Sequence, residues 1–232
     1  MGLRGAITEV ATTASGERSG VLLRLLFPIV LLEAALWAPR PLAVLCGICA
    51  LWYVSWHLWE VAGKSAALGL DLRGLLKAPV LLGATSMIAI ALLAAAYYSG
   101  SLHRLWGLQN PWYAALGYVC WALIQEFMLQ CFCFRMLRVL VSRVGSLLLS
   151  GVVFSIAHLP NPSLTLLTFF AGIAFTFIYV RKRNLYVVAL IHAILGLTLA
   201  VSAPDAWFHG LRVGRDFLEG PRAITAEAIP RR

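Results

Sequence analysis

The chain has 232 residues, of which 61% are hydrophobic and only 12% are charged, and its mean hydropathy is +0.83. Soluble domains carry about a quarter charged residues, so this composition excludes an ordinary water-soluble domain. The formal net charge is +9, but the basic residues form short clusters between apolar runs, which is typical of membrane proteins and not of nucleic-acid binding; we therefore expect no nucleic-acid partner.

Apolar runs between charged residues and Pro or Gly breaks predict the transmembrane helices. A membrane-spanning helix needs about 20 mainly apolar residues. The predicted spans cover residues 20–38, 41–62, 79–99, 112–134, 145–160, 163–180 and 185–202. The predicted fold class is therefore all-α, a polytopic transmembrane helical bundle of seven spans, or of eight if a poorly apolar segment around 196–211 re-enters. We expect residues 1–232 to form a single transmembrane domain.

The distribution of lysine and arginine predicts the orientation of the bundle. Loops 63–78, 135–144 and 181–184 carry three basic residues each and the N-terminal segment 1–19 carries two, whereas the opposing loops carry one, one and none. Because basic loops stay on the cytoplasmic side, we expect a multi-pass protein of the cell membrane with a cytoplasmic N-terminus. The tail 203–232 has too little apolar content to span, and we expect an interfacial or disordered end.

The fourth predicted span carries polar side chains at membrane depth, where such groups are costly unless they are paired or hydrated. Glu126 lies near the middle of the run 112–134, with Gln125 beside it and Gln130 about one helical turn further on. On an α-helix these three positions fall within about 140° of arc. They can therefore share one inward face, and we treat them as candidate functional residues.

Two later spans each add a histidine. His158 ends the run 145–160 and follows Phe154 by four residues, which places both side chains on one face of a helix, and His192 lies within 185–202. Three helices thus each offer a polar cluster at similar depth. A structural interpretation is also open, because Gln, His and Glu commonly form hydrogen bonds between transmembrane helices.

Two acidic residues lie in earlier spans, outside this set. We expect Glu33 to pair with Arg24 or Arg40, and Glu60 to lie near Lys64. Both are therefore predicted to be peripheral to any chemistry.

The motifs on the three later helices resemble those of the CPBP family of intramembrane proteases, which includes CAAX-processing endopeptidases and bacteriocin-processing or self-immunity proteins. Members of that family show EExxxR, FxxxH and HxxxN on successive helices. The likeness covers about residues 71–200, the expected family-like catalytic core. In the same order and spacing, the chain has Gln125-Glu126-Phe-Met-Leu-Gln130, Phe154-Ser-Ile-Ala-His158 and His192-Ala-Ile-Leu-Gly196.

The chain departs from the family pattern at three polar positions. The first Glu of the family is Gln125 here, the Arg is Gln130, and the final Asn is Gly196. In the family the first Glu acts as general base on a water molecule, but a neutral amide cannot accept that proton. The base is therefore assigned to Glu126. Loss of the Arg is consistent with loss of one Glu, because an unpaired buried charge is costly.

The resemblance implies a glutamic-type intramembrane endopeptidase that needs no cofactor or metal and cleaves membrane-anchored or lipidated peptide segments. It implies that His158 positions the water and that His192 donates to the oxyanion. The supporting residues are Gln125, Gln130, Phe154 and Gly196.

Two other functions stay open at the level of the sequence. A catalytically silent family member could bind peptides or lipids as an immunity or scaffold protein, which the changes at Gln125 and Gly196 favour. A metal or serine protease is the third reading: two histidines and a glutamate could bind zinc, although HExxH is absent. Ser150-Gly151 partly matches a serine nucleophile motif, with His192 as its base.

Overall fold

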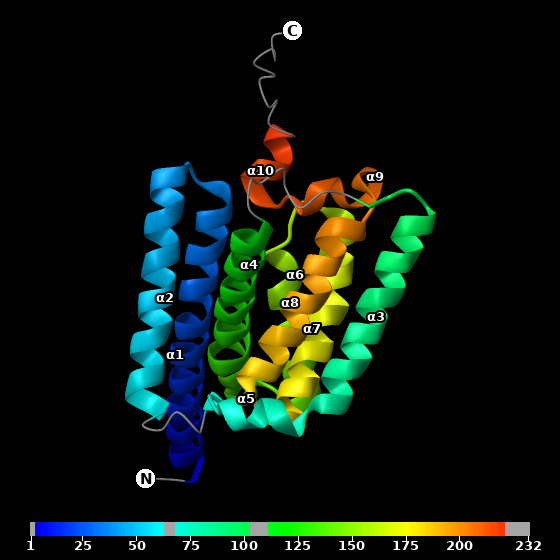
Figure 1. Cartoon of the computed structure of the whole chain (residues 1–232). Coiled ribbons are helices and arrows are strands. Elements are labelled where there is room, and N and C mark those ends of the chain that lie inside the picture. The colour runs from blue at the N-terminus through cyan, green and yellow to red at the C-terminus, as the bar shows by residue number, and fades with distance from the viewer. Residues whose placement is uncertain (1–2, 63–67, 103–110, 221–232) are drawn as a thin grey trace, which may run out of the picture.

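The structure, a computed structural model, describes residues 3–62, 68–102 and 111–220. These residues form helices, turns and loops without β-strands, and the long helices lie side by side in one bundle (Figure 1). The long elements are α1 (Leu3–Trp37), α2 (Arg40–Ala62), α3 (Pro79–Tyr98), α4 (Pro111–Glu126), the π-helix η3 (Phe127–Cys133), α5 (Phe134–Leu140), α6 (Arg143–Ile156), α7 (Pro162–Lys182) and α8 (Leu185–Ser202).

The predicted polytopic bundle is confirmed. Within the described part of the chain, six helices are long and apolar enough to cross a membrane, and α6 is a shorter apolar helix. The fourth predicted span continues through η3 and α5 to Leu140, and the fifth ends at Ile156. Because a proline disfavours helical backbone in the residue before it, Pro160 and Pro162 stop α6 from joining α7. His158 consequently lies in the turn between them.

A segment that comprises residues 68–77 ties the ends of α7 and α8 together. It includes the short helix η2 (Leu72–Lys77) and passes beneath the bundle (Figure 1). Asn184 is 2% exposed and directly precedes α8, which its side-chain oxygen caps by accepting a hydrogen bond from the Val187 amide (2.9 Å). The bonds from α7 and α8 to this segment run from Tyr179 Oη to Leu68 O (3.0 Å), from Leu185 N to Gly69 O (2.9 Å) and from Asn184 Nδ2 to Asp71 O.

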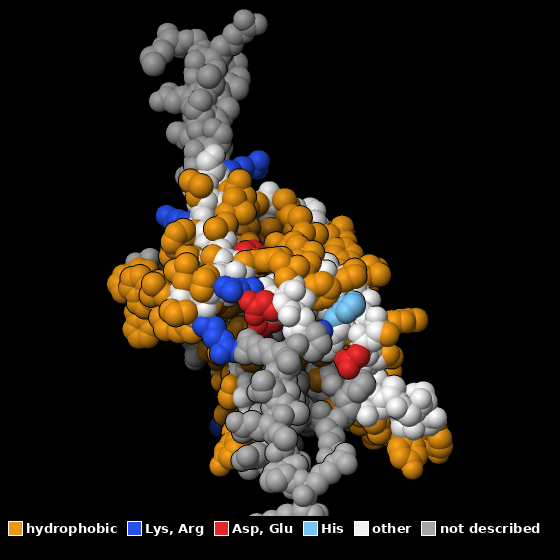
Figure 2. All heavy atoms as spheres, turned by 90° about the horizontal axis from the view of Figure 1, so that it is seen from above, with side chains coloured by type: hydrophobic (Ala, Val, Ile, Leu, Met, Phe, Trp, Pro, Cys, Tyr) orange, Lys and Arg blue, Asp and Glu red, His pale blue; other side chains and the backbone are white. Residues whose placement is uncertain are grey.

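Short helices cross the opposite end of the bundle, namely α9 (Asp205–Phe208), η4 (His209–Leu211) and α10 (Gly214–Glu219) (Figure 1). The side chain of Asn161, at the start of α7, donates to the carbonyl oxygens of Phe208 (2.7 Å) and Arg212 (3.2 Å). Seen from this end, charged side chains lie among the short helices and hydrophobic ones surround them (Figure 2). Residues 221–232 of the predicted tail lie outside the described residues.

The basic loops gather at one end of the bundle. The described part of the loop 63–78 and the loops 135–144 and 181–184 all lie at the end where α1 begins (Figure 1). This arrangement agrees with the sidedness used to orient the chain, and the cytoplasmic location of that end stays a prediction.

Gly69 offers a test of the segment 68–77. Its φ is +72°, and a Cβ there would lie 2.7 Å from the carbonyl oxygen of Arg183; Gly100 has φ +71° but open space around it. We expect Gly100→Ala to lower the free energy of unfolding by about 1–2 kcal/mol, the cost of left-handed backbone, and Gly69→Ala by about 2–4 kcal/mol because it also displaces α8. Unfolding in detergent micelles measures both, and equal losses would show that the segment does not hold α8.

Candidate active site

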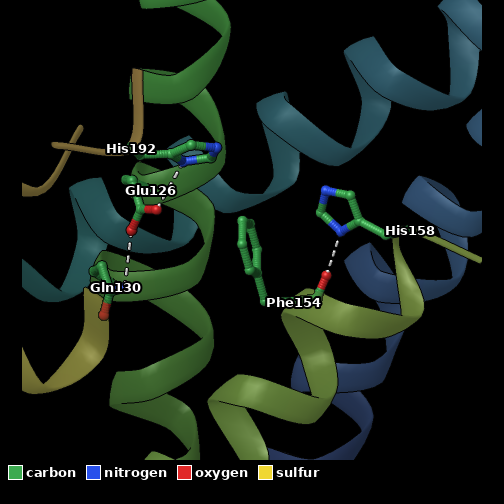
Figure 3. Close-up of polar contacts among 5 residues, drawn as sticks. All are labelled: Glu126, Gln130, Phe154, His158 and His192. Carbon is green, nitrogen blue, oxygen red and sulfur yellow. Dashed lines mark hydrogen bonds and ion pairs between the residues drawn. The ribbon is translucent and has the colours of Figure 1, made fainter. Parts of the chain in front are cut away.

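The Glu126 carboxylate occupies the centre of the site. Glu126 is the last residue of α4 and is 0% exposed. Its Oε1 lies 2.9 Å from Nδ1 of His192 on α8, and its Oε2 accepts a 2.9 Å hydrogen bond from Nε2 of Gln130 (Figure 3). A buried carboxylate is tolerated only when hydrogen-bond donors replace the lost water, and here each oxygen has one.

A π-helix begins directly after this carboxylate. Residues Phe127–Cys133 form η3, and every residue from Met128 to Cys133 is buried. Such helices are rare and occur frequently at functional sites. Because all faces of η3 are buried, Gln130 next to Glu126 is enclosed by protein and its amide is held in place. The apolar run 112–134 carries no sequence signal that separates π-helical from α-helical backbone.

The His192 ring is fixed by aromatic side chains. It stacks on Phe175 of α7 with ring centroids 5.2 Å apart, and it meets the rings of Phe154 and Tyr118 edge to face at 5.4 and 6.2 Å. With Glu126 ionised, Nδ1 of His192 is the donor in their hydrogen bond. In the neutral ring Nε2 is then an acceptor, so the expected donation to an oxyanion needs a second proton on this imidazole.

His158 lies on the other side of Phe154 from Glu126 (Figure 3). Its Nδ1 is 2.7 Å from the carbonyl oxygen of Phe154. Because a carbonyl oxygen only accepts, Nδ1 carries the proton and Nε2 is an acceptor. The Phe154 and His158 rings lie 5.0 Å apart, and among the described residues no hydrogen bond joins His158 to Glu126. The structure thus brings Glu126, Gln130 and His192 into direct contact and links His158 to them through the Phe154 ring.

Gln125 and Gly196, the two remaining supporting residues, differ in position. Gln125 is half-buried, and no hydrogen bond joins it to Glu126 or His192 in the described part of the chain. Gly196 lies one helical turn after His192, and a Cβ there would lie 2.0 Å from the hydroxyl oxygen of Tyr118. Tyr118 was missed at the sequence level, since a tyrosine in an apolar run reads as an ordinary membrane aromatic. The only sign of this contact in the sequence is the glycine at position 196, which leaves room for the Tyr118 ring.

The early acidic residue behaves differently from the prediction. Glu33 accepts a hydrogen bond from the side chain of Trp37, one turn further along α1, and the expected ion pair with Arg24 or Arg40 is not formed within the described residues. The i,i+4 spacing places the indole within reach without extending a long side chain. The Glu60 side chain and Lys64 lie outside the described residues.

The metal and serine alternatives were also compared with the geometry. Among the residues that the structure describes, no group of three His, Cys, Asp or Glu side chains is arranged to hold a metal ion. Ser150 is 0% exposed, and its hydroxyl donates to the carbonyl oxygen of Ser146 in its own helix (2.8 Å). That bond directs the hydroxyl along α6, without a hydrogen bond to His192.

A groove of about 510 Å³ lies beside the turn that carries His158, between α6 and α7. Its walls are mainly apolar, and they include Leu159, the residue that follows His158 in the chain. The lining residues are Ser155, Leu159, Pro160, Pro162, Thr165, Leu166 and Phe169.

Comparison with known families agrees with the motifs. Residues 106–198 match the family described as type II CAAX prenyl endopeptidase Rce1-like, which confirms the resemblance drawn from the sequence. The match includes α4, η3, α5, α6, α7 and most of α8, and hence Glu126, His158 and His192. Comparisons with curated proteins and with solved structures gave no match.

The contact between Glu126 and His192 is open to a thermodynamic test. His192→Ala should lower the free energy of unfolding by about 3–5 kcal/mol, because it leaves a buried carboxylate with one partner fewer. When Glu126→Gln is already present, His192→Ala should lower the free energy of unfolding by about 1.5–3 kcal/mol less. In that protein His192→Ala no longer breaks a hydrogen bond to a charged carboxylate. Unfolding of the four proteins in micelles measures this coupling.

The matched control is a second double-mutant cycle, in which Gln125→Ala takes the place of Glu126→Gln and is combined with His192→Ala. Because Gln125 makes no bond to His192, the two losses should add to within about 0.5 kcal/mol. Equal coupling in both cycles would contradict the contact.

Proposed function

Residues 106–198 match the Rce1-like family, and from this premise we propose that the protein is a glutamic-type intramembrane endopeptidase. The observation that carries the proposal is the buried Glu126 carboxylate, whose two oxygens accept hydrogen bonds from Gln130 and His192. A carboxylate at this depth is costly, and its retention with dedicated donors is typical of a functional group.

In the proposed reaction Glu126 acts as the general base. It accepts one proton from a water molecule while the water oxygen bonds to the carbonyl carbon of the peptide, whose oxygen becomes an oxyanion. When this tetrahedral intermediate collapses, the C–N bond breaks and the proton held by Glu126 passes to the leaving nitrogen. The products are a carboxylic acid and an amine, and the Glu126 carboxylate is restored.

The two histidines take different parts in this scheme. His192 holds Oε1 of the carboxylate and so sets the direction in which Glu126 meets the water. Nε2 of His158, left as an acceptor by the bond to Phe154, takes the second hydrogen bond from the water. Phe154 lies between His158 and Glu126, so in this scheme its phenyl ring turns aside before the water contacts both side chains.

The substrate is proposed to be a membrane-anchored or lipidated peptide segment. Glu126 and His192 are 0% and 6% exposed, so water-soluble chains have little access. In this proposal the apolar groove beside the turn that carries His158 receives the segment from the lipid phase, where an anchored substrate is already concentrated.

A silent relative that binds such peptides without cleaving them is the second candidate. The position of Phe154 favours it, since the ring separates His158 from Glu126 and would have to turn before water could contact both. Cleavage assays decide between the two functions.

Single substitutions test the roles directly. Glu126→Gln should abolish cleavage of membrane-anchored peptides, because an amide cannot accept the proton. His158→Ala and His192→Ala should each lower kcat by about 10²-fold or more. Gln125→Ala should lower it less, because no hydrogen bond joins Gln125 to Glu126 or His192. The measurement is cleavage of a library of anchored peptides by purified protein, with unfolding curves to verify that each variant is folded.

Glu33→Gln is the control for this series, since it removes a carboxylate from an apolar helix outside the matched residues 106–198 and should leave cleavage unchanged. Wild-type cleavage by Glu126→Gln would end the glutamic assignment. If the parent protein cleaved none of the anchored peptides, the silent relative would be favoured.

Inhibitors separate the remaining chemistries. Neither a strong chelator nor a serine-directed phosphonate should slow the parent, because the proposed reaction uses a carboxylate and water. A zinc protease and a serine protease of known sensitivity serve as controls in the same detergent. Loss of cleavage with either reagent would replace the glutamic mechanism by the corresponding one.

A further inference from the structure

The turn that carries His158 lies beyond the end of α6, so the place of this imidazole depends on what holds the turn. The bond from His158 Nδ1 to the carbonyl oxygen of Phe154 fixes one ring nitrogen relative to α6, which ends at Ile156. The backbone from which the ring extends belongs to the turn itself. The amide of Asn161 closes this turn by donating to the carbonyl oxygen of His158 (3.2 Å).

The side chain of Asn161 anchors the far end of the turn. Asn161 is 0% exposed, and its Oδ1 caps α7 by accepting a hydrogen bond from the Leu164 amide (3.2 Å). Its Nδ2 donates to the carbonyl oxygens of Phe208 (2.7 Å) and Arg212 (3.2 Å). These two carbonyl groups lie at the ends of α9 and η4, where a helix leaves its own carbonyl oxygens without partners. One buried amide thus joins the turn to two short helices.

A second bond joins the same short helices to the turn. The amide of Gly214, the first residue of α10, donates to the carbonyl oxygen of Leu159 (2.6 Å). Gly214 has φ +54°, and a Cβ there would lie 2.3 Å from the carbonyl oxygen of Leu36 in α1. Glycine is therefore required for the chain to pass between α1 and the turn and still bring its amide to Leu159.

The residues that hold the turn belong to one stretch of chain, the segment 204–219. It contains α9, η4 and α10, follows the end of α8, and crosses this end of the bundle (Figure 1). It lies entirely beyond residue 198, where the match to the Rce1-like family ends. The matched residues supply His158, and residues outside the match hold the turn in which it lies.

We propose that the segment 204–219 positions His158 for catalysis, and that Asn161 is the side chain through which it does so. Asn161 is a positioning residue, because in the proposed reaction it contacts neither the water nor the peptide and acts through the imidazole. A misplacement of about 1 Å can lower a rate by about 10²-fold, so these bonds matter for the rate as well as for the fold. This inference rests on the proposed function.

The first test is Asn161→Ser. Serine is also a favoured N-cap residue, so the cap on α7 is kept, but both bonds from Nδ2 to the segment 204–219 are lost. We expect kcat for anchored peptides to fall by about 10–100-fold, no further than with His158→Ala, and KM to stay within about twofold. Unfolding curves in the same detergent verify that the variant is folded.

Gly100→Ala is the matched control for a loss of stability. Gly100 also has left-handed backbone, with φ +71°, but a Cβ there meets no atom within 4 Å. The substitution strains the chain without contacting the turn, so kcat and KM should stay unchanged. An equal fall of kcat in Gly100→Ala and Asn161→Ser would show that lower stability alone slows the reaction, and would overturn the positioning role.

Gly214→Ala tests the other bond from a different position in the chain. Its Cβ would collide with Leu36, so the Gly214 amide would be displaced from Leu159 and kcat should fall as in Asn161→Ser. Each of the two variants decides the question by itself, so the test does not depend on the folding of one of them.

A double-mutant cycle with His158 separates positioning from a purely structural role. In a protein that already carries His158→Ala, Asn161→Ser should lower kcat by less than about twofold, because the imidazole that it positions is gone. A purely structural role predicts the same fall in kcat with and without His158. Gly214→Ala should follow the pattern of Asn161→Ser in this cycle.

The outcomes distinguish this inference from the proposed function. If the parent cleaves, Glu126→Gln does not, and Asn161→Ser and Gly214→Ala keep the parental kcat, the positioning role is wrong while the glutamic mechanism stands. The same conclusion follows if both variants lower kcat equally with and without His158. If the parent cleaves no anchored peptide, both proposals fall together.

Discussion

The burial of one carboxylate governs the organisation of this bundle. Glu126 is removed from water entirely and depends on donors from η3 and α8 for both of its oxygens. Those donors are useful only while α8 keeps its position, which the bonds from Asn184 and Leu185 to the segment 68–77 maintain. Thus polar contacts at the edge of the bundle support a polar pair in its middle.

Much of the fold could be predicted from the sequence because the bilayer imposes a simple rule. A long apolar run that crosses the bilayer must be a helix here, because a helix makes all of its backbone hydrogen bonds within its own segment. The same rule made Glu126, Gln130 and His192 conspicuous, and these three side chains are in contact. Even so, their spacing along the chain did not say that His192 would hold Glu126 through Nδ1.

Features that arise from packing between helices were not accessible in this way. The π-helical backbone of η3 has no composition of its own, and the partnership of Tyr118 with Gly196 joins residues 78 positions apart. His158 was predicted within a span but lies in a turn that Pro160 and Pro162 create. Glu33 was predicted to form an ion pair with an arginine, but the side chain of Trp37, one turn further along α1, donates a hydrogen bond to it instead.

The π-helix also sets the helical phase of everything that follows it. Each residue of an α-helix advances the chain by about 100°, so an insertion or deletion of one residue within 127–133 would rotate α5 by that angle relative to Glu126. The faces of α5 that now pack on α1 and α6 would then turn toward lipid. Related chains that keep this site should therefore vary in length elsewhere, in the tail or the loops. The number of residues between Glu126 and Phe134 should stay constant among them.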